Sequence, residues 1–362
     1  MHVAVNALFM EQPQTGSGQY IRHLLAALRV VDPALRLSLF KSPLAPHPGR
    51  RGENVSKLLW EQGVVAILAA RSGAELLHIP YWAPPLFSPI PVVATIHDVI
   101  PALLPEYRGS ALVAAYTKVV GGAARRARRL IVDSECSKRD LVRVVGVSPQ
   151  RVDVVPLAAG AVFRPIDRTE AADFCRQQWG LERPFLLYVG GNDVRKNVPA
   201  LLHAWSTAST RLPGHNLVIG GRMRCEPPFF PDVQGLAAQL ELPRTHFLGA
   251  ISDVEKHQLL GGCVAFVWPS RYEGFGLPPL EAMQTGAPVI SSDRSSMPEV
   301  VGPAGLLISP DDIPALAEAM VRIASDATLR ARLQVAGPAQ ASQFSWRRTA
   351  ALTAESYRRA LE

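Results

Sequence analysis

Two glutamates, Glu273 and Glu281, lie eight residues apart around a segment rich in glycine and proline. A hydrophobic run ends before them at Trp268, and the prolines at 278 and 279 suit the first turn of a helix that contains Glu281. The N–H groups of such a turn bind anions, and glycines let a phosphate or sugar approach the backbone. We therefore expect Glu281, within that first turn, to bind ribose hydroxyls and Glu273 to bind sugar hydroxyls, with further ligand contacts from Gly274, Phe275, Gly276 and Leu277.

Two other interpretations of this glutamate pair stay open at this point. Glu281 could merely complement the helix dipole while Glu273 is solvated. Paired carboxylates also occur in glycosidases, where they must stand on opposite sides of the bond that is cleaved. That arrangement is disfavoured because Glu273 and Glu281 both flank a segment suited to phosphate.

A second cluster brings two glycines and two cations close together in the chain. Gly190 and Gly191 end an apolar run, and Arg195 and Lys196 stand directly before the helix-like segment 198–205. Arginine holds phosphate oxygens with two hydrogen bonds and lysine adds a compact charge, so this cluster suits a diphosphate. The alternative is a solvated Arg-Lys pair on a loop.

Two further clusters in the first half of the chain carry polar residues near expected strand or helix ends. His97 and Asp98 end a run of β-branched residues, where side chains face a ligand if the strand is parallel. His97 could bond an acceptor or a sugar hydroxyl with Asp98 nearby, although a histidine at a strand end is often structural. Gly16, Ser17 and Gly18 precede a helix that runs through Leu28, and they indicate a mobile loop at a helix start, or an ordinary turn, and not a dinucleotide-binding fingerprint.

The chain has a formal net charge of +7 at pH 7, which favours an acidic partner. No nucleic-acid-binding motif accompanies this charge, so we expect no nucleic acid. A basic run follows a helix-like segment and suits either an anionic membrane or lipid-linked phosphate, or a solvated helix face. Its members are Arg125, Arg126, Arg128 and Arg129.

The cysteines and the hydropathy pattern bear on redox state, metal binding and membrane insertion. The four cysteines are widely spaced and have no metal-ligand spacing, so we expect buried free thiols and no metal. No stretch has the length and apolar character of a membrane span, and no signal peptide is apparent at the N-terminus. We therefore expect a cytoplasmic location, with at most peripheral contact at the inner face of a membrane.

Short runs rich in Val, Ile and Leu alternate with helix-like segments, which is typical of parallel strands covered by helices on both faces. About six such runs in each half predict two Rossmann-like, doubly wound α/β domains with a ligand crevice between their sheets. We expect domains at 1–163 and 164–345, and a helix at 346–362, capped by Ser345, that could pack back on the first domain. The expected strands are 2–5, 35–40, 76–80, 92–97, 130–133, 152–156, 185–190, 216–220, 246–249, 264–268, 288–291 and 305–308.

Taken together and in this order, the four clusters resemble those of the retaining glycosyltransferases of family 4, which have the GT-B fold. The most specific part is the Glu-x7-Glu segment with its interior Gly274–Leu277, and the segments 132–140 and 154–157 match as well. The resemblance covers nearly the whole chain. One departure is that the family's N-terminal loop usually carries adjacent glycines, whereas Ser17 separates Gly16 from Gly18 here.

The resemblance implies transfer of a sugar from a nucleotide diphosphate with retention of configuration, without a metal or other cofactor. It assigns Glu273 to the donor sugar, Glu281 to the ribose, Arg195 and Lys196 to the donor diphosphate and His97 to the reacting centre. It also places Gly16, Ser17, Gly18, Gly190 and Gly191 near the donor and Asp98 on the acceptor side. The segment 78–85 is similar to that of bacterial mannosyltransferases of polysaccharide assembly, which favours GDP-mannose as donor and a saccharide or lipid-linked acceptor.

Three rival functions remain. A GT-B-fold epimerase or phosphorylase would share the architecture. A dinucleotide-dependent oxidoreductase is disfavoured by the poor glycine fingerprint. A non-catalytic nucleotide-sugar-binding protein is disfavoured because His97, Arg195, Lys196 and both glutamates occur together.

Overall fold

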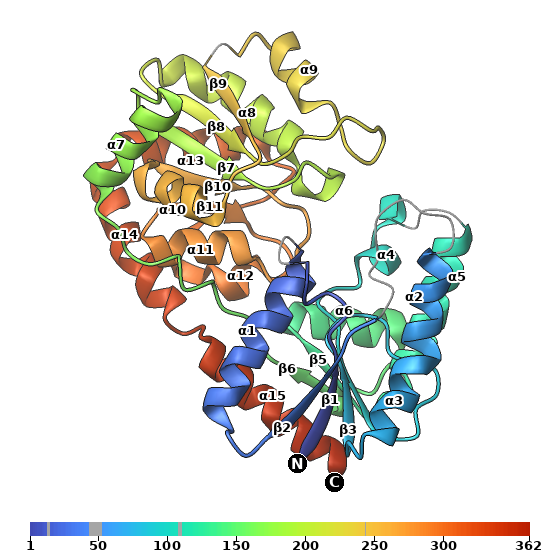
Figure 1. Cartoon of the computed structure of the whole chain (residues 1–362). Helices are drawn as coiled ribbons and strands as arrows, with labels where there is room; N and C mark the ends of the chain where they lie inside the picture. The colour runs from blue at the N-terminus through green and yellow to red at the C-terminus, as the bar shows by residue number, and fades with distance from the viewer. Residues whose placement is uncertain (13–14, 43–52, 108–110, 243) are drawn as a thin grey trace. The chain divides into compact units, whose positions relative to one another are not determined.

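The computed structural model describes residues 1–12, 15–42, 53–107, 111–242 and 244–362. Its internal contacts divide the chain into two compact units. Unit 1 comprises Met1–Leu157 together with Ser345–Glu362, and unit 2 comprises Ala158–Phe344. Both chain termini therefore belong to unit 1 (Figure 1).

Unit 1 is built on a parallel six-stranded sheet with the order β2-β1-β3-β4-β5-β6. Its strands are β1 (His2–Asn6), β2 (Arg36–Phe40), β3 (Leu76–Ile79), β4 (Val92–Thr95), β5 (Arg129–Val132) and β6 (Val152–Val154). Every residue of β1, β3 and β4 is buried, as expected for central strands covered on both faces. In the β3–β4 pairing His78 lies opposite Val93, so Thr95, two residues further along β4, projects from the same face as His78.

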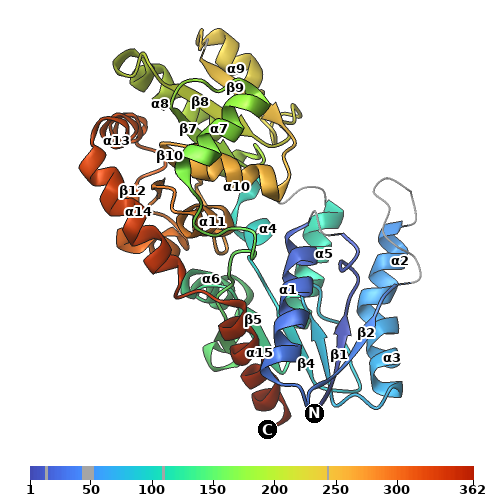
Figure 2. The ribbon, with the colours of Figure 1, turned by 60° about the vertical axis from the view of Figure 1, so that its left-hand side comes forward.

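Helices cover both faces of this sheet. Helix α1 (Gly16–Val31) packs against the C-terminal helix α15 (Trp346–Leu361), and α15 also contacts β3, β4 and β5 (Figures 1 and 2). Buried apolar residues of α3 (Val65–Arg71), α5 (Ala111–Ala124) and α6 (Glu135–Val145) pack on the strands with Leu77, Ile79 and Leu130. The other helical elements of unit 1 are α2 (Glu53–Leu59), the π-helical turn η1 (Trp60–Val64), α4 (Ile100–Leu103), η2 (Pro105–Tyr107) and η3 (Pro149–Arg151).

Unit 2 is a second parallel six-stranded sheet, with the order β12-β11-β10-β7-β8-β9. The order reverses between β7 and β10, and the crevice at such a switch point is where open α/β sheets bind ligands. The strands are β7 (Phe185–Val189), β8 (Asn216–Gly220), β9 (Thr245–Gly249), β10 (Ala265–Trp268), β11 (Val289–Ser292) and β12 (Gly305–Ile308). The helical elements are α7 (Arg168–Trp179), η4 (Val194–Lys196), α8 (Val198–Arg211), α9 (Val233–Gln239), α10 (Asp253–Gly262), α11 (Leu277–Thr285), α12 (Met297–Val300), η5 (Gly302–Ala304), α13 (Ile313–Ser325) and α14 (Ala327–Ala341).

The predicted α/β class and all of the predicted strands are confirmed, with bounds that differ by at most two residues at either end. The strands 216–220 and 305–308 have the predicted bounds. Strand β4 ends at Thr95, so His97 lies in the loop that follows the strand. Ser345 caps α15 as expected, because its side chain accepts a hydrogen bond from the Arg348 N–H at 3.2 Å.

The predicted helix start at Gly16, Ser17 and Gly18 is confirmed, but the predicted loop is wrong, because these residues are the first turn of α1. Thr15 is the N-cap, and its hydroxyl oxygen accepts a hydrogen bond from the Gly18 N–H at 3.1 Å. A Cβ at Gly18 would overlap the Gln12 carbonyl, so the turn before the helix requires glycine there. The sequence signal missed was Thr15 as a cap.

The basic run also differs from the predicted helix face, because it follows the end of α5 and leads into β5. Arg125, Arg126 and Arg128 are exposed, and each donates a hydrogen bond to a backbone carbonyl, of Val145, Leu86 and Ala360 respectively. Arg129 begins β5 and forms an ion pair with Asp153 at 2.5 Å. In the parts of the chain that the structure describes, no helix has the length and apolar character needed to cross a membrane.

The prediction of buried thiols fails for one of the four cysteines. All four are free, and Cys136, Cys175 and Cys263 are buried, but Cys225 is exposed. Cys225 lies in the connection between β8 and α9, outside either core. Periodicity carries no information on burial in such a segment.

Candidate active site

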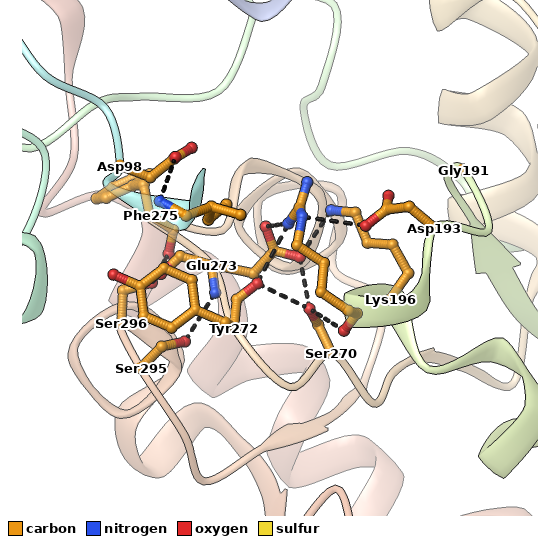
Figure 3. A network of polar contacts seen from close by, with 12 residues as sticks. Asp98, Gly191, Asp193, Lys196, Ser270, Tyr272, Glu273, Phe275, Ser295 and Ser296 are labelled. Atoms are coloured by element: carbon orange, nitrogen blue, oxygen red, sulfur yellow. Dashed lines mark hydrogen bonds and ion pairs between the residues drawn. The ribbon is translucent and has the colours of Figure 1, made fainter. Parts of the chain in front are cut away.

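In unit 2, the loops that follow β7 and β10 meet around the carboxylate of Glu273 (Figure 3). Glu273 Oε2 accepts a hydrogen bond from Arg195 Nη1 at 2.6 Å, and Oε1 accepts one from Lys196 Nζ at 2.7 Å. Ser270 Oγ donates to the same Oε1 at 2.7 Å. Arg195 Nε is also 3.1 Å from Asp193 Oδ1. The structure thus brings together the three residues that we predict to contact the donor sugar and diphosphate, at the switch point of the sheet.

Two serines hold the backbone of the Glu273 loop in place. Ser295 Oγ accepts a hydrogen bond from the Glu273 N–H at 2.9 Å. Ser296 Oγ, which is fully buried, lies 3.0 Å from the Glu273 carbonyl oxygen and 2.6 Å from that of Phe275. Sequence reasoning missed both serines, since nothing in their spacing relates them to a loop some 20 residues earlier.

Asn197 connects the two loops directly and was also missed. It separates Lys196 from α8, adopts a left-handed backbone with φ of 58°, and is 4% exposed. Its Nδ2 donates to the carbonyl oxygens of Pro269 at 3.2 Å and Pro310 at 2.8 Å. The available signal was an asparagine before Val-Pro at a helix start, because asparagine tolerates the left-handed conformation.

Gly190 lets two aromatic rings pack beneath Lys196. A Cβ at Gly190 would lie 2.8 Å from the ring of Trp268 and 3.0 Å from the Tyr188 hydroxyl. The Tyr188 and Trp268 rings stack at 5.2 Å, and Lys196 Nζ lies 4.4 Å from the centre of a Trp268 ring. The Tyr188 hydroxyl donates to the carbonyl of Gly191 at 2.5 Å. Gly190 and Gly191 therefore contact the same pair of aromatic rings on which Lys196 lies.

Burial and the opposite charges within the cluster shift the pKa values of Glu273 and Lys196 in competing ways. Burial raises the pKa of Glu273, but Lys196 and Arg195 lower it by more, so the net shift is below the ordinary value. Burial lowers the pKa of Lys196 and the attraction of Glu273 opposes that shift, but the neighbouring Arg195 adds to it, so the net shift is below the ordinary value. The side chains of Arg195, Lys196 and Glu273 are 18%, 11% and 9% exposed, so the two cations remain within reach of a ligand.

Glu281 lies in the second turn of α11, whereas we predicted the first, because the helix begins at Leu277. Its carboxylate forms an ion pair with Lys256 of α10. Burial raises the pKa of Glu281 and Lys256 opposes the shift, leaving the pKa above its ordinary value. Glu281 does not join the Glu273 cluster through any contact among the described residues, and Lys256 was missed by sequence reasoning.

The start of α11 supplies fewer backbone donors than we predicted. Pro278 and Pro279 occupy the first turn as expected, but neither has an N–H group. The Leu280 N–H bonds the carbonyl of Gly276 at 3.3 Å, which leaves the Leu277 N–H as the donor of that turn. Gly276 has φ of 112°, a conformation that favours glycine.

Phe275 and Gly274 are the remaining residues of this loop that we predict to contact a ligand. The Phe275 side chain is 5% exposed and packs edge-on against Phe344, with ring centres 5.6 Å apart. Its side chain therefore belongs to the core of unit 2. Gly274 lies between Glu273 and Phe275 and is buried.

In unit 1, His97 lies in the loop after β4 and pairs with Asp133, the residue that follows β5. His97 Nδ1 is 2.8 Å from Asp133 Oδ2, and the His97 side chain is 24% exposed. Burial lowers the pKa of His97. The charge of Asp133 and its hydrogen bond raise this pKa, with smaller contributions from Asp98 and the Pro80 carbonyl. Together they outweigh burial, so the net shift is above the ordinary value. Asp133 was missed, and its signal was a carboxylate directly after an apolar run.

Asp98 and the glycines of α1 belong to the same unit as His97. Asp98 Oδ1 accepts a hydrogen bond from the Ile100 N–H at 3.0 Å, at the start of α4. Gly16, Ser17 and Gly18 form the first turn of α1, and Tyr20 in the next turn packs edge-on against His97.

The whole chain matches solved structures that define its fold class. It aligns with the sucrose-phosphate synthase of Thermosynechococcus elongatus at a TM-score of 0.79 and 22% identity, covering 99% of this chain and 98% of that one. It aligns with HepE of Anabaena, in complex with UDP and glucose, at a TM-score of 0.75 and 18% identity over 99% of both chains. Two parallel six-stranded sheets with this full-length likeness define a GT-B fold.

Sequence comparisons identify the family. Residues 18–158 match the description Glycosyltransferase Family 4, and residues 171–340 match Glycosyl transferases group 1. The O-antigen chain mannosyltransferase B of Escherichia coli is 30% identical over 74% of this chain and 70% of its own length. The serotype-specific mannosyltransferase WbdA of Escherichia coli is 30% identical over 76% of this chain but only 34% of its own length. The chain belongs to glycosyltransferase family 4.

Proposed function

We propose that this protein transfers a sugar from a nucleotide diphosphate to a saccharide or lipid-linked acceptor, with retention of configuration and without a metal. The observation that carries the proposal is the pair of partly buried cations, Arg195 and Lys196, held by Glu273 at the switch point of unit 2. Two cations fixed beside Gly190 and Gly191 suit the two phosphates of such a donor.

In the proposed reaction the bond between the sugar C1 and the donor's β-phosphate oxygen breaks, and C1 forms a bond with the acceptor oxygen on the same face. The acceptor's proton passes to the departing phosphate, so no carboxylate nucleophile is needed. Negative charge grows on the diphosphate as the bond breaks, and Arg195 and Lys196 stabilise it. Asp193 and Glu273 balance the charges of these two cations and hold them in place.

Our assignment of the donor rests on the relatives. The two Escherichia coli relatives at 30% identity are named mannosyltransferases, which favours GDP-mannose, while HepE was solved with UDP and glucose. Glu281 binds the ribose in this proposal, and its carboxylate must be ionised to accept both ribose hydroxyls.

On the acceptor side, His97 stands at the reacting centre, an assignment that rests on the family resemblance. Its pairing with Asp133 orients the imidazole and stabilises its protonated form. We propose further that exposed Arg125, Arg126 and Arg128 contact the phosphates of a lipid-linked acceptor or an anionic membrane.

The test is a panel of GDP-mannose, UDP-glucose, UDP-N-acetylglucosamine and NAD, each incubated with the protein with and without a chelator. We expect one donor to raise the melting temperature and to be slowly hydrolysed, at the same rate in both conditions. Stabilisation by NAD and by none of the sugar nucleotides would overturn the proposal. Release of nucleotide diphosphate should accelerate when a saccharide acceptor is added, which separates transfer from epimerisation.

A further inference from the structure

A continuous run of buried polar side chains in unit 1 connects the C-terminal helix α15 with the ring beside His97. The Tyr357 hydroxyl lies 2.8 Å from His78 Nδ1, and His78 Nε2 lies 3.0 Å from Thr95 Oγ1. Thr95 Oγ1 is in turn 3.1 Å from the Tyr20 hydroxyl. The Tyr20 ring meets the His97 ring edge-on, with centres 4.7 Å apart and planes at 84°.

The members of this run can satisfy their hydrogen bonds only with one another and with adjacent protein groups. Tyr357, His78 and Thr95 are 0% exposed, and Tyr20 is 3% exposed. Buried hydroxyls and imidazoles that lose a partner cannot turn to bulk water instead, so the run tolerates few arrangements.

His78 is neutral, so one of its ring nitrogens donates a hydrogen bond within the run and the other accepts one. Burial, and then the nearby His97, lower the pKa of His78 to about 3. A neutral imidazole has one donor and one acceptor nitrogen, so one ring nitrogen donates to a hydroxyl oxygen while the other accepts a hydroxyl hydrogen. Removing the Tyr357 hydroxyl would leave His78 Nδ1 without its partner and would disturb the bond from His78 to Thr95.

We infer that Tyr357 and His78 are positioning residues for His97. They hold Thr95 and the Tyr20 hydroxyl in place, the Tyr20 ring then confines the imidazole of His97, and His97 is thereby kept aligned with Asp133. The effect on turnover rests on the proposed function of His97, whereas the contact with the His97 ring does not.

The run reaches across most of the chain, because Tyr357 and His78 are separated by 279 residues. Other contacts fix α15 independently of the run. The Thr349 hydroxyl donates to the Pro156 carbonyl at 2.6 Å, and the buried Ser356 hydroxyl donates to Asp153 at 2.7 Å. Ser356 therefore offers a matched control, since it is next to Tyr357 and also makes one buried hydrogen bond from its side chain to the body of unit 1.

The first experiment compares Tyr357→Phe with Ser356→Ala in the full-length protein. Tyr357→Phe removes one oxygen and keeps the ring, so we expect kcat to fall about tenfold while the Kd for the nucleotide diphosphate, bound by unit 2, changes less than about twofold. Ser356→Ala should lower thermal stability by a similar amount and leave kcat within about twofold of the wild type. Equal loss of kcat in both variants would reduce Tyr357 to a structural role and overturn the inference.

The second readout is the imidazole of His97, followed by NMR titration. Among the described residues, the charged groups that act on it are Asp133 after β5 and Asp98 in its own loop, and Tyr20 from α1 and neutral His78 from β3 also lie beside it. We expect Tyr357→Phe to move the His97 pKa down towards its ordinary value, because a looser ring weakens the bond to Asp133. An unchanged titration, equal to that of Ser356→Ala, would overturn the inference.

A double variant separates this inference from the proposed function. If Tyr357 acts through His97, adding Tyr357→Phe to His97→Ala should cause no further loss of kcat, and a full additional tenfold loss would contradict the inference. If His97→Ala alone leaves turnover unchanged, the proposed role of His97 fails. The NMR titration of Tyr357→Phe still decides, in that event, whether the run positions the ring.

Discussion

The Glu273 cluster of unit 2 and the His97 cluster of unit 1 both lie beyond the carboxyl ends of parallel strands, but they are built from different groups. Around Glu273, two cations face two carboxylates within ion-pair distance. Around His97, one ion pair with Asp133 is backed by a run of neutral hydroxyls and a neutral histidine. Unit 2 therefore presents two cationic side chains that carboxylates hold in place, and unit 1 presents a single ring that its surroundings confine.

This difference follows from what each cluster is proposed to do. A departing diphosphate carries much charge, and fixed cations stabilise that charge where water is excluded. A histidine at a reacting centre needs a defined orientation and tautomer, which hydrogen-bonded neighbours impose at less cost than buried charges. Substitutions should accordingly act on turnover in unit 2 through charge and in unit 1 through geometry.

The largest effect should come from Arg195→Ala or Lys196→Ala. Each removes a cation from the proposed diphosphate site, so we expect kcat to fall by about a hundredfold to a thousandfold with the fold retained. Steady-state kinetics with the best donor of the panel, together with circular dichroism, measure this.

Arg211→Ala is the matched control for these variants, because Arg211 forms an exposed ion pair with Glu318 in the same unit. It should leave kcat unchanged. Near-normal turnover in both Arg195→Ala and Lys196→Ala would remove the charge-based account of unit 2.

A smaller effect is expected for Glu281→Gln, which keeps the shape of the side chain and removes its charge. We expect nucleotide affinity to fall about tenfold, because an amide is a weaker acceptor for ribose hydroxyls than a carboxylate. Isothermal calorimetry measures the affinity, with Glu318→Gln as an exposed control. Since Lys256 loses its partner in this variant, a melting curve must show that the protein is still folded at the titration temperature.

The smallest effect concerns stability against pH, where the two clusters should behave in opposite ways. The pKa of Glu273 lies below its ordinary value of 4.5 in the folded chain, so the unfolded chain takes up protons first as pH falls, and the stabilisation is lost on acidification. The pKa of His97 lies above its ordinary value of 6.5, so its stabilisation is present below pH 6.5 and is lost as pH rises through the folded pKa.

Urea unfolding from pH 3.5 to 8.5 tests this contrast. We expect Glu273→Gln to reduce the loss of stability towards acid pH, and His97→Ala to reduce the loss of stability above pH 6.5. Each variant serves as the control for the other. If both variants changed the pH dependence of stability over the same pH range, the two clusters would not differ in this way.

Local sequence was sufficient for the fold class, because a strand buried on both faces requires a contiguous apolar run, and such runs survive in the sequence unaltered. Strands such as β8 and β12 were predicted to the residue. The errors in the prediction concern where two helices begin, which a single residue at the helix start can change. Thr15 begins α1 before the glycines, and the start of α11 at Leu277 moves Glu281 into the second turn.

The sequence by itself predicted the residues of the candidate site, with Arg195 and Lys196 in one loop, Glu273 in another, and His97 beside Asp98. It also determined the family, because the Glu-x7-Glu segment and its glycines are local patterns. Only the tertiary structure decided that Glu273 pairs with both cations, that Glu281 pairs with Lys256, and that Tyr357 contacts His78. The physical reason is that such pairs depend on which strands are neighbours and on how a terminal helix packs. Propensity and periodicity act over a few residues, whereas these partners are separated by 25 to 279 residues.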